Sequence, residues 1–291
     1  MTSFHKVLFP TDFSKGADHA LQHAVRLADV QKGEVIVQHV VSTYFENHSH
    51  WTTLFDIHEM QKYMDMYVET EMERIIPEEV KGAISFRNVI SEGKPAKAIV
   101  ELADKEMVDI VVMGPAKGVV TGPVIRATER PVLAVPNNGN GNGVQPLHKV
   151  SSILVTTDFS EHSKKAVDYA FELKQLFDCE IYLLYVIELT SAIKFGIRQG
   201  HFTDATAKMR TWAETQLENL TPHQYVNDQT VHRLVEEGSA VDNIAARAEM
   251  NDVDMVVLGA HGYGPVEKHF VGSTTDKVLA KLERPVLTVK I

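Results

Sequence analysis

The sequence predicts an α/β protein made of two tandem copies of one doubly wound domain, each built around a parallel sheet. Two observations lead to this fold. Segments of the chain recur in the same order, and within each copy short apolar runs alternate with helical patterns. A third is the length, because 291 residues suit two domains of ordinary size. Each copy is therefore expected to read βαβαβαβαβ.

Four pairs of matching segments carry the duplication. They are residues 6–14 with 152–160, 91–93 with 236–238, 108–114 with 253–259, and 129–133 with 283–287. Between the copies, residues 136–143 consist of Pro, Asn and Gly, which is typical of a flexible tether. We therefore expect a first domain over residues 1–137 and a second over residues 148–291.

The first two strands of each copy are expected at 7–9 and 35–41, and at 153–155 and 181–187. These runs are continuously apolar rather than alternating, which indicates strands buried on both faces of a parallel sheet. Between them, apolar residues recur three and four positions apart, as on the buried face of a helix. They are Ala20, Ala24, Leu27 and Ala28 in copy one, and Ala166, Tyr169, Ala170, Leu173 and Phe177 in copy two.

The remaining elements continue the alternation. Ser14 and Ser160 stand at the expected N-cap of the first helix. The later elements are a helix at 55–76 or 203–220, a strand at 84–90 or 230–235, a helix from Ala96 or Val241, a Val-rich fourth strand, and a closing strand at 132–135 or 286–289. In such sheets ligands bind outside the carboxyl ends of the strands where the winding reverses, so the loops after the first and fourth strands should meet there.

The loop after the fourth strand of copy two combines glycines with hydroxyl residues before a helix. Gly272, Ser273, Thr274 and Thr275 can offer backbone amides and hydroxyls to an anion at the helix N-terminus. The pattern is neither a Walker loop nor the dinucleotide fingerprint. It predicts a phosphate cradle, with a glycine-rich turn that only connects strand and helix as the alternative.

These motifs have a family parallel. The spacing Gly259-x2-Gly262-x9-Gly272-Ser273, with Asp-Phe-Ser after the first strand and Arg-Pro-Val at the closing strand, resembles the nucleotide-binding type of the universal stress protein family over nearly all of both halves. The resemblance implies Rossmann-like ATP-binding domains of five parallel strands in the order 3-2-1-4-5, and a role in stress tolerance. It also implies that the two closing strands pair antiparallel, which would make the chain a pseudo-dimer.

The resemblance further implies an ATP site in the second half. Its residues would be Thr157 and Asp158 at the adenosine, Val186, Leu258 and Gly259 around the base and ribose, Gly262, Gly272, Ser273, Thr274 and Thr275 at the phosphates, and His261 in a positioning role. Glu267 and Asp276 are near enough in sequence for one of them to hold a Mg²⁺ ion brought by ATP, although neither spacing is diagnostic.

The first half departs from this pattern. Gly114 and Arg130 are 16 positions apart, whereas Gly259 and Arg284 are 25 apart, so nine loop residues are absent from copy one. Val119 and Val120 follow its last glycine and cannot replace hydroxyls, and Pro115 lacks an amide donor. We therefore predict one nucleotide site per chain, with Asp12 left as a turn or cap residue.

Composition excludes several classes of protein. The net charge of −10 disfavours nucleic acid and anionic lipid as partners. The longest apolar runs are strand-sized and cannot cross a bilayer, and no signal-peptide core precedes Pro10. A single cysteine, Cys179, forbids an internal disulfide and favours a reducing compartment. We expect a cytoplasmic protein without a membrane partner.

Three functions remain open at this point. The first is a nonenzymatic regulator in which bound ATP shifts the population of a surface that binds a protein partner, as yet unknown. The second is a slow ATPase or self-phosphorylating protein. The third is a stress module in which copy one holds a small ligand or a metal, with His48, His50 and His58 as candidate zinc ligands. Further association of two chains is also left open.

Two residue sets receive a structural interpretation. Met60, Met64, Met66 and Met72 are mostly at helical spacing, which favours core packing over a partner surface. Lys164, Lys165, Lys174 and Lys268 are interpreted as a solvated face rather than a nucleic-acid groove.

Overall fold

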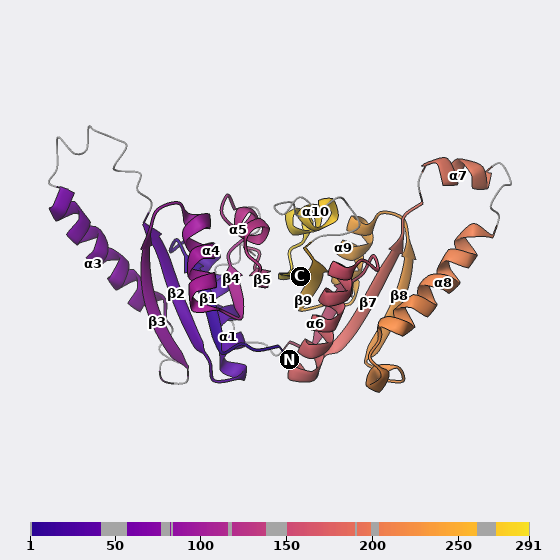
Figure 1. Cartoon of the computed structure of the whole chain (residues 1–291), viewed down its shortest axis with the longest axis horizontal. Coiled ribbons are helices and arrows are strands. Elements are labelled where there is room, and N and C mark those ends of the chain that lie inside the picture. The colour runs from indigo at the N-terminus through magenta and orange to yellow at the C-terminus, as the bar shows by residue number, and fades with distance from the viewer. Residues whose placement is uncertain are drawn as a thin grey trace. The chain divides into compact units, whose positions relative to one another are not determined.

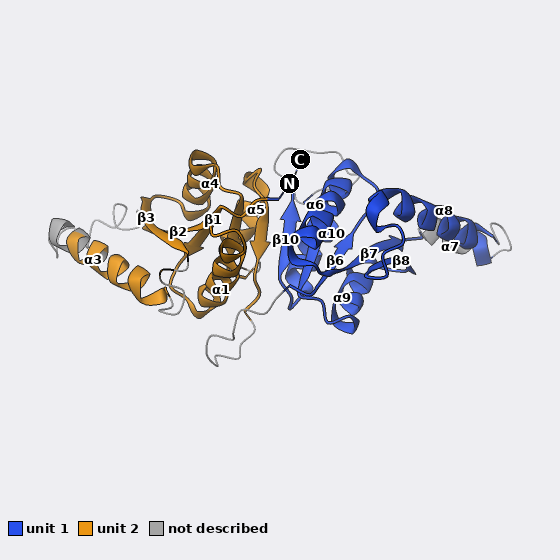
Figure 2. Ribbon diagram, turned by 90° about the horizontal axis from the view of Figure 1, so that it is seen from below, with its two compact units in different colours: residues 1–2, 148–291 blue, residues 3–147 orange. Residues whose placement is uncertain are grey.

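A computed structural model describes most of the chain. It covers residues 2–41, 57–76, 82, 84–115, 118–137, 150–189, 191–198, 204–260 and 272–290. The chain divides into two compact units (Figure 2). One is Ser3–Leu147, called the N-terminal unit below, and the other is His148–Ile291 together with Met1–Thr2, called the C-terminal unit.

The N-terminal unit contains five parallel strands in the order β3-β2-β1-β4-β5 (Figure 1). Its elements are β1 (Lys6–Thr11), α1 (Lys15–Val30), β2 (Glu34–Val41), α3 (Ile57–Ile75), β3 (Ser85–Glu92), α4 (Pro95–Glu106), β4 (Ile110–Met113), α5 (Thr121–Ala127) and β5 (Val132–Ala134). This is the order 3-2-1-4-5 that the family resemblance implies.

The C-terminal unit repeats the topology, with parallel strands in the order β8-β7-β6-β9-β10. Its elements are β6 (Ser152–Thr156), α6 (Glu161–Phe177), β7 (Glu180–Ile187), α7 (Ser191–Arg198), α8 (Ala205–Leu220), a 3-10 turn (His223–Tyr225), β8 (Val231–Glu237), α9 (Ala240–Met250), β9 (Met255–Gly259), α10 (Ser273–Lys281) and β10 (Val286–Val289). Helix α7 and the 3-10 turn were not expected from the sequence.

Burial explains the continuous apolar runs of the central strands. In β4 every residue is buried, in β9 only the last residue is partly exposed, and in β6 only the two end residues are. Winding runs outward from β1 to β3, returns to β4 and continues to β5, so α4 and α5 contact each other on one face while α1 covers the opposite one. The winding reverses between β1 and β4, and likewise between β6 and β9.

The first helix of each unit begins at the expected serine. Ser14 accepts a hydrogen bond from the Ala17 amide at 3.4 Å, and Ser160 accepts one from the Ser163 amide at 3.3 Å. Both serines have extended backbone, as an N-cap residue requires. These caps fix where α1 and α6 start relative to the strands that precede them.

The interpretation of Lys174 as a solvated side chain is wrong. Lys174 is 5% exposed, and its ammonium group donates to the Cys179 carbonyl at 3.0 Å and to Thr230 Oγ1 at 2.6 Å. Asp228 lies 3.3 Å from the same nitrogen. An aliphatic stem allows a lysine to be buried when its three donors have partners, and here three oxygens surround it.

The methionine interpretation holds only in part. Both Met72 and Met66 belong to α3. Met72 is fully buried, but Met66 is 55% exposed. The side chains of Met60 and Met64 lie outside the described residues, as does Lys268. Helical spacing therefore identified one core position and misassigned another, because α3 buries only a narrow stripe.

Candidate functional site

Three segments of the C-terminal unit meet at the carboxyl edge of its sheet, where the winding reverses. They are the turn after β6, the end of β9 and the N-terminus of α10. Gly259 makes the approach of the first two possible. A Cβ atom at this position would lie 3.0 Å from the carbonyl of His162 and from the Ser163 amide nitrogen, so only glycine lets β9 pass this close to α6.

Residues 157–160 form a tight polar turn. Thr157 Oγ1 accepts the Phe159 amide at 2.9 Å, and Asp158 Oδ1 accepts the Ser160 amide at 3.0 Å. Phe159 has a φ of 65°, which is uncommon for a residue with a side chain. One oxygen of Asp158 thus fixes the turn, and the residue is partly exposed at the carboxyl edge of the sheet.

The helix α10 begins at this edge and is fastened to β9 by two bonds. The Gly272 amide donates to the Ala260 carbonyl at 2.9 Å, and Thr275 Oγ1 donates to the Gly259 carbonyl at 3.0 Å. Thr275 is buried, Thr274 is partly exposed and Ser273 is exposed. Its N-cap residue is Gly272, which has no side chain to accept the first amides. A helix N-terminus with hydroxyls at its first positions favours an anion.

The structure thus brings most of the predicted site together. Thr157, Asp158, Leu258, Gly259, Gly272, Ser273, Thr274 and Thr275 come from the three meeting segments, and Val186 lies near the end of β7, the neighbour of β6. Leu258 is buried, whereas Val186 is half-buried. His261, Gly262 and Glu267 lie outside the described residues.

The N-terminal unit has the same turn with a different helix terminus. Asp12 Oδ1 accepts the Ser14 amide at 3.0 Å, so Asp12 is a turn residue, as the sequence predicts. Thr121 Oγ1 lies 3.4 Å from the Gly114 carbonyl. This contact is the counterpart of the 3.0 Å bond from Thr275 to Gly259. Counting back from the closing strand, Val119 and Val120 occupy the positions of Ser273 and Thr274.

Apolar groups replace polar ones at this edge of the N-terminal unit. The Val119 side chain is 92% exposed at the start of α5. The ring of Pro115 lies against Gly16 at the start of α1, where an added Cβ would be only 3.1 Å from Pro115 Cδ. Neither side chain can donate a hydrogen bond to a phosphate oxygen. The two units therefore share the fold and the aspartate turn but differ in the side-chain hydrogen-bond donors at this edge.

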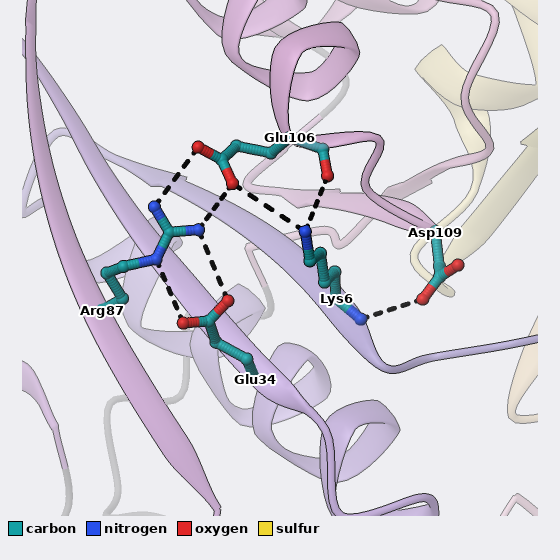
Figure 3. A network of polar contacts seen from close by, with 5 residues as sticks. All are labelled: Lys6, Glu34, Arg87, Glu106 and Asp109. Carbon is teal, nitrogen blue, oxygen red and sulfur yellow. Dashed lines mark hydrogen bonds and ion pairs between the residues drawn. The ribbon is translucent and has the colours of Figure 1, made fainter.

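The charged cluster of the N-terminal unit lies at the opposite edge of its sheet (Figure 3). Arg87 donates to Glu34 at 3.1 Å and to Glu106 at 2.7 Å, and Lys6 Nζ donates to the Glu106 carbonyl at 3.1 Å. The hydrogen bonds from Arg87 lower the pKa of Glu106. Because Glu34 and Glu106 are each paired with a cation and Asp109 accepts from the Lys6 backbone amide at 2.8 Å, the cluster ties strand ends together rather than offering a reactive group.

The described residues contain no group of three or more His, Cys, Asp or Glu side chains arranged to hold a metal ion. His48 and His50 fall outside the described residues, and so does the side chain of His58. Within the same part of the chain, no helix is long and apolar enough to cross a membrane.

Comparison with known proteins matches this architecture twice along the chain. The model of the universal stress protein family matches residues 3–136 and again residues 149–290. The chain belongs to the universal stress protein family. Two domains of this family therefore follow one another along the chain, each containing five of the parallel strands.

Individual relatives agree with this assignment. A universal stress protein of Methanocaldococcus jannaschii is 29% identical over 45% of this chain and 94% of its own length. One from Methanothermobacter thermautotrophicus is 31% identical over 40% of this chain and 80% of its own. The crystal structure of a universal stress protein from Archaeoglobus fulgidus covers 99% of both chains with a TM-score of 0.69 at 21% identity, which concerns the fold alone.

Proposed function

We propose that this universal stress protein binds one ATP per chain in its C-terminal unit and acts as a nucleotide-dependent regulator rather than a metabolic enzyme. Family membership supports a role in the stress response. The observation that carries the ATP proposal is the exposed α10 terminus, with Gly272, Ser273 and Thr274, at the same sheet edge as Asp158.

The proposed roles follow the chemistry of each group. Asp158, fixed by its turn, accepts a hydroxyl of the ribose through its second oxygen. Val186 and the backbone around Leu258 and Gly259 border the base, because an apolar strand end suits a flat ring. Gly272, Ser273 and Thr274 take the phosphates, with Gly262 and His261 contributed by the preceding loop. Thr275 braces the helix through its bond to Gly259, at 3.0 Å.

The difference between the two units supports a single ATP site per chain. An ATP phosphate chain placed at the start of α5 would meet the side chain of Val119, which has no donor, and Pro115, which lacks even a backbone N–H group. The net charge of −10 adds a general repulsion that only a local set of amides and hydroxyls would overcome. A Mg²⁺ ion would arrive with ATP, and Asp276 in the first turn of α10 is the described carboxylate best placed to receive it.

Isothermal titration of the full chain with MgATP tests the proposal. We expect one site, and we expect Ser273→Val combined with Thr274→Val to weaken binding about tenfold or more through lost hydrogen bonds to charged oxygens. The matched control, Val119→Ser with Val120→Thr, should leave the affinity of the C-terminal site for MgATP unchanged. Two equivalent sites, or binding unaffected by the C-terminal pair, would contradict the proposal.

The regulatory role has its own test. Incubation with γ-labelled ATP should release less than one phosphate per chain, because the described part of the site lacks a pair of carboxylates around the phosphate position. Multiple turnovers that disappear in Ser273→Ala would favour the slow ATPase instead. We extend the proposal to the cytoplasm, since the chain has a single cysteine, the buried Cys179, which cannot form a disulfide within the chain.

A further inference from the structure

Three aromatic rings pack together behind the aspartate turn of the C-terminal unit. They come from the turn (Phe159), from β7 (Tyr185) and from α8 (Trp212). The Phe159 and Tyr185 ring centroids are 4.6 Å apart, and Trp212 meets Phe159 edge-on at 5.1 Å and 78°. Trp212 also contacts Tyr185 edge-on at 6.2 Å. Edge-to-face rings at these distances attract each other beyond simple burial.

The central ring belongs to the strained residue of the turn. Phe159 has a φ of 65°, a conformation that side chains disfavour and that persists only where surrounding contacts hold it. Two contacts do so: its amide is bonded to Thr157 Oγ1, and its ring, 8% exposed, is enclosed by Tyr185 and Trp212. Asp158 directly precedes Phe159, so the direction of its carboxylate depends on this backbone.

Trp212 is not required to attach α8 to the sheet. Ala213 and Leu217 are fully buried under that helix, whereas Trp212 is 49% exposed. Its ring meets those of Phe159 and Tyr185. Removing its ring would therefore loosen the turn without opening a cavity in the main core.

We infer that Trp212 is a positioning residue for the ligand of the C-terminal unit, acting through Phe159 on Asp158. The inference rests on the proposed function, because it requires Asp158 to contact the nucleotide. In a looser turn the Asp158 carboxylate would adopt directions in which it does not contact the ligand. Binding would then have to order the turn, and this loss of conformational entropy would weaken the affinity.

The N-terminal unit supplies a matched control. Phe13 has a φ of 60° in the equivalent turn, stacks on His39 at 4.6 Å, and meets Tyr67 edge-on at 6.3 Å. Tyr67 occupies the position of Trp212 and is 54% exposed. A truncation at Tyr67 thus removes a similar ring from the unit for which we propose no ATP site.

The experiment is MgATP titration of the full chain carrying Trp212→Ala, Trp212→Phe or Tyr67→Ala. We expect about three- to tenfold weaker binding for Trp212→Ala, the range of one aromatic pair. Trp212→Phe should restore binding to within about twofold, because a phenyl edge can still meet Phe159. Tyr67→Ala should leave the affinity unchanged. If Trp212→Ala unfolds, Trp212→Leu replaces it, since leucine keeps bulk without the aromatic edge.

A double-mutant cycle separates positioning from general loosening. If Trp212 acts through Asp158, Trp212→Ala should change affinity less than twofold in an Asp158→Asn background. Additive losses would overturn the inference, as would wild-type affinity in Trp212→Ala. If the wild-type chain binds ATP and substitution of Ser273 weakens that binding, but Trp212→Ala does not, the role of Trp212 is refuted and the proposed ATP site stands. Absence of ATP binding by the wild type would overturn both it and the proposed function.

Discussion

Replacing Thr275 with valine separates two roles for its hydroxyl. In the structure this buried hydroxyl donates to the Gly259 carbonyl at 3.0 Å and so ties α10 to β9. The resemblance to the universal stress protein family instead assigns this hydroxyl to a phosphate of ATP. Valine keeps the branched shape and removes only the donor, so stability and ATP affinity report on the two roles independently.

The expected loss of stability follows from the environment of the carbonyl. A hydrogen bond of this kind contributes about 1 kcal/mol net, and an acceptor left fully buried without a donor costs about 1–3 kcal/mol. Gly259 is partly exposed, so water can reach its carbonyl and the lower figure applies. We expect Thr275→Val to destabilise the C-terminal unit by about 1 kcal/mol, a fall of about 4 °C in Tm for a unit of this size.

Thermal unfolding and MgATP titration of the same samples provide the assay. Thr121→Val is the control, because its hydroxyl is 3.4 Å from the Gly114 carbonyl and its loss should cost less than about half as much. ATP affinity should change by no more than about twofold in Thr275→Val, because Gly272 still bonds to Ala260. Unchanged stability with a tenfold loss of affinity would refute the bracing role and assign the hydroxyl to phosphate.

Three further predictions concern Lys174, its partner Asp228 and Cys179 in the C-terminal unit. Lys174→Met should destabilise it by about 2–3 kcal/mol in urea unfolding, since Thr230 and Asp228 lose a buried cation, and a loss below about 0.5 kcal/mol would show the ammonium to be dispensable. Hydrogen bonds from Thr230, and then Lys174, lower the pKa of Asp228, so its contribution is complete above the ordinary value and disappears as the pH falls through the lowered one. Asp228→Asn should therefore flatten the stability profile below about pH 4, and an unchanged acid limb would exclude this carboxylate as the cause. Burial raises the pKa of the Cys179 thiol to about 11, so a thiol reagent at pH 8 should react only after unfolding, and rapid labelling of the native chain would contradict this.

The predicted asymmetry shows how far residue patterns reach. Ser273 begins α10, whereas Val119, at the matched sequence position, lies two residues before α5, and the difference between a hydroxyl and an isopropyl group is visible in the sequence alone. The turn at Asp158 is also within reach of sequence-based prediction, because its hydrogen bonds join residues two positions apart. Helix α7 was not, since residues 188–203 carry neither a clear cap nor a long apolar stripe.

The sequence by itself determined the duplication, the alternation of strands and helices in each copy apart from α7 and the 3-10 turn, and the replacement of Ser273 and Thr274 by valines in the first copy. These features depend on neighbours along the chain or on repetition, both of which a single sequence displays. Tertiary structure alone decided that Lys174 is buried, that Thr275 donates to Gly259, and that Trp212 packs on Phe159. The partners in these contacts are at least five and as many as 56 residues apart, as for Lys174 and Thr230. Only the folding of strands and helices against one another brings them together, and no local periodicity encodes which pairs will meet.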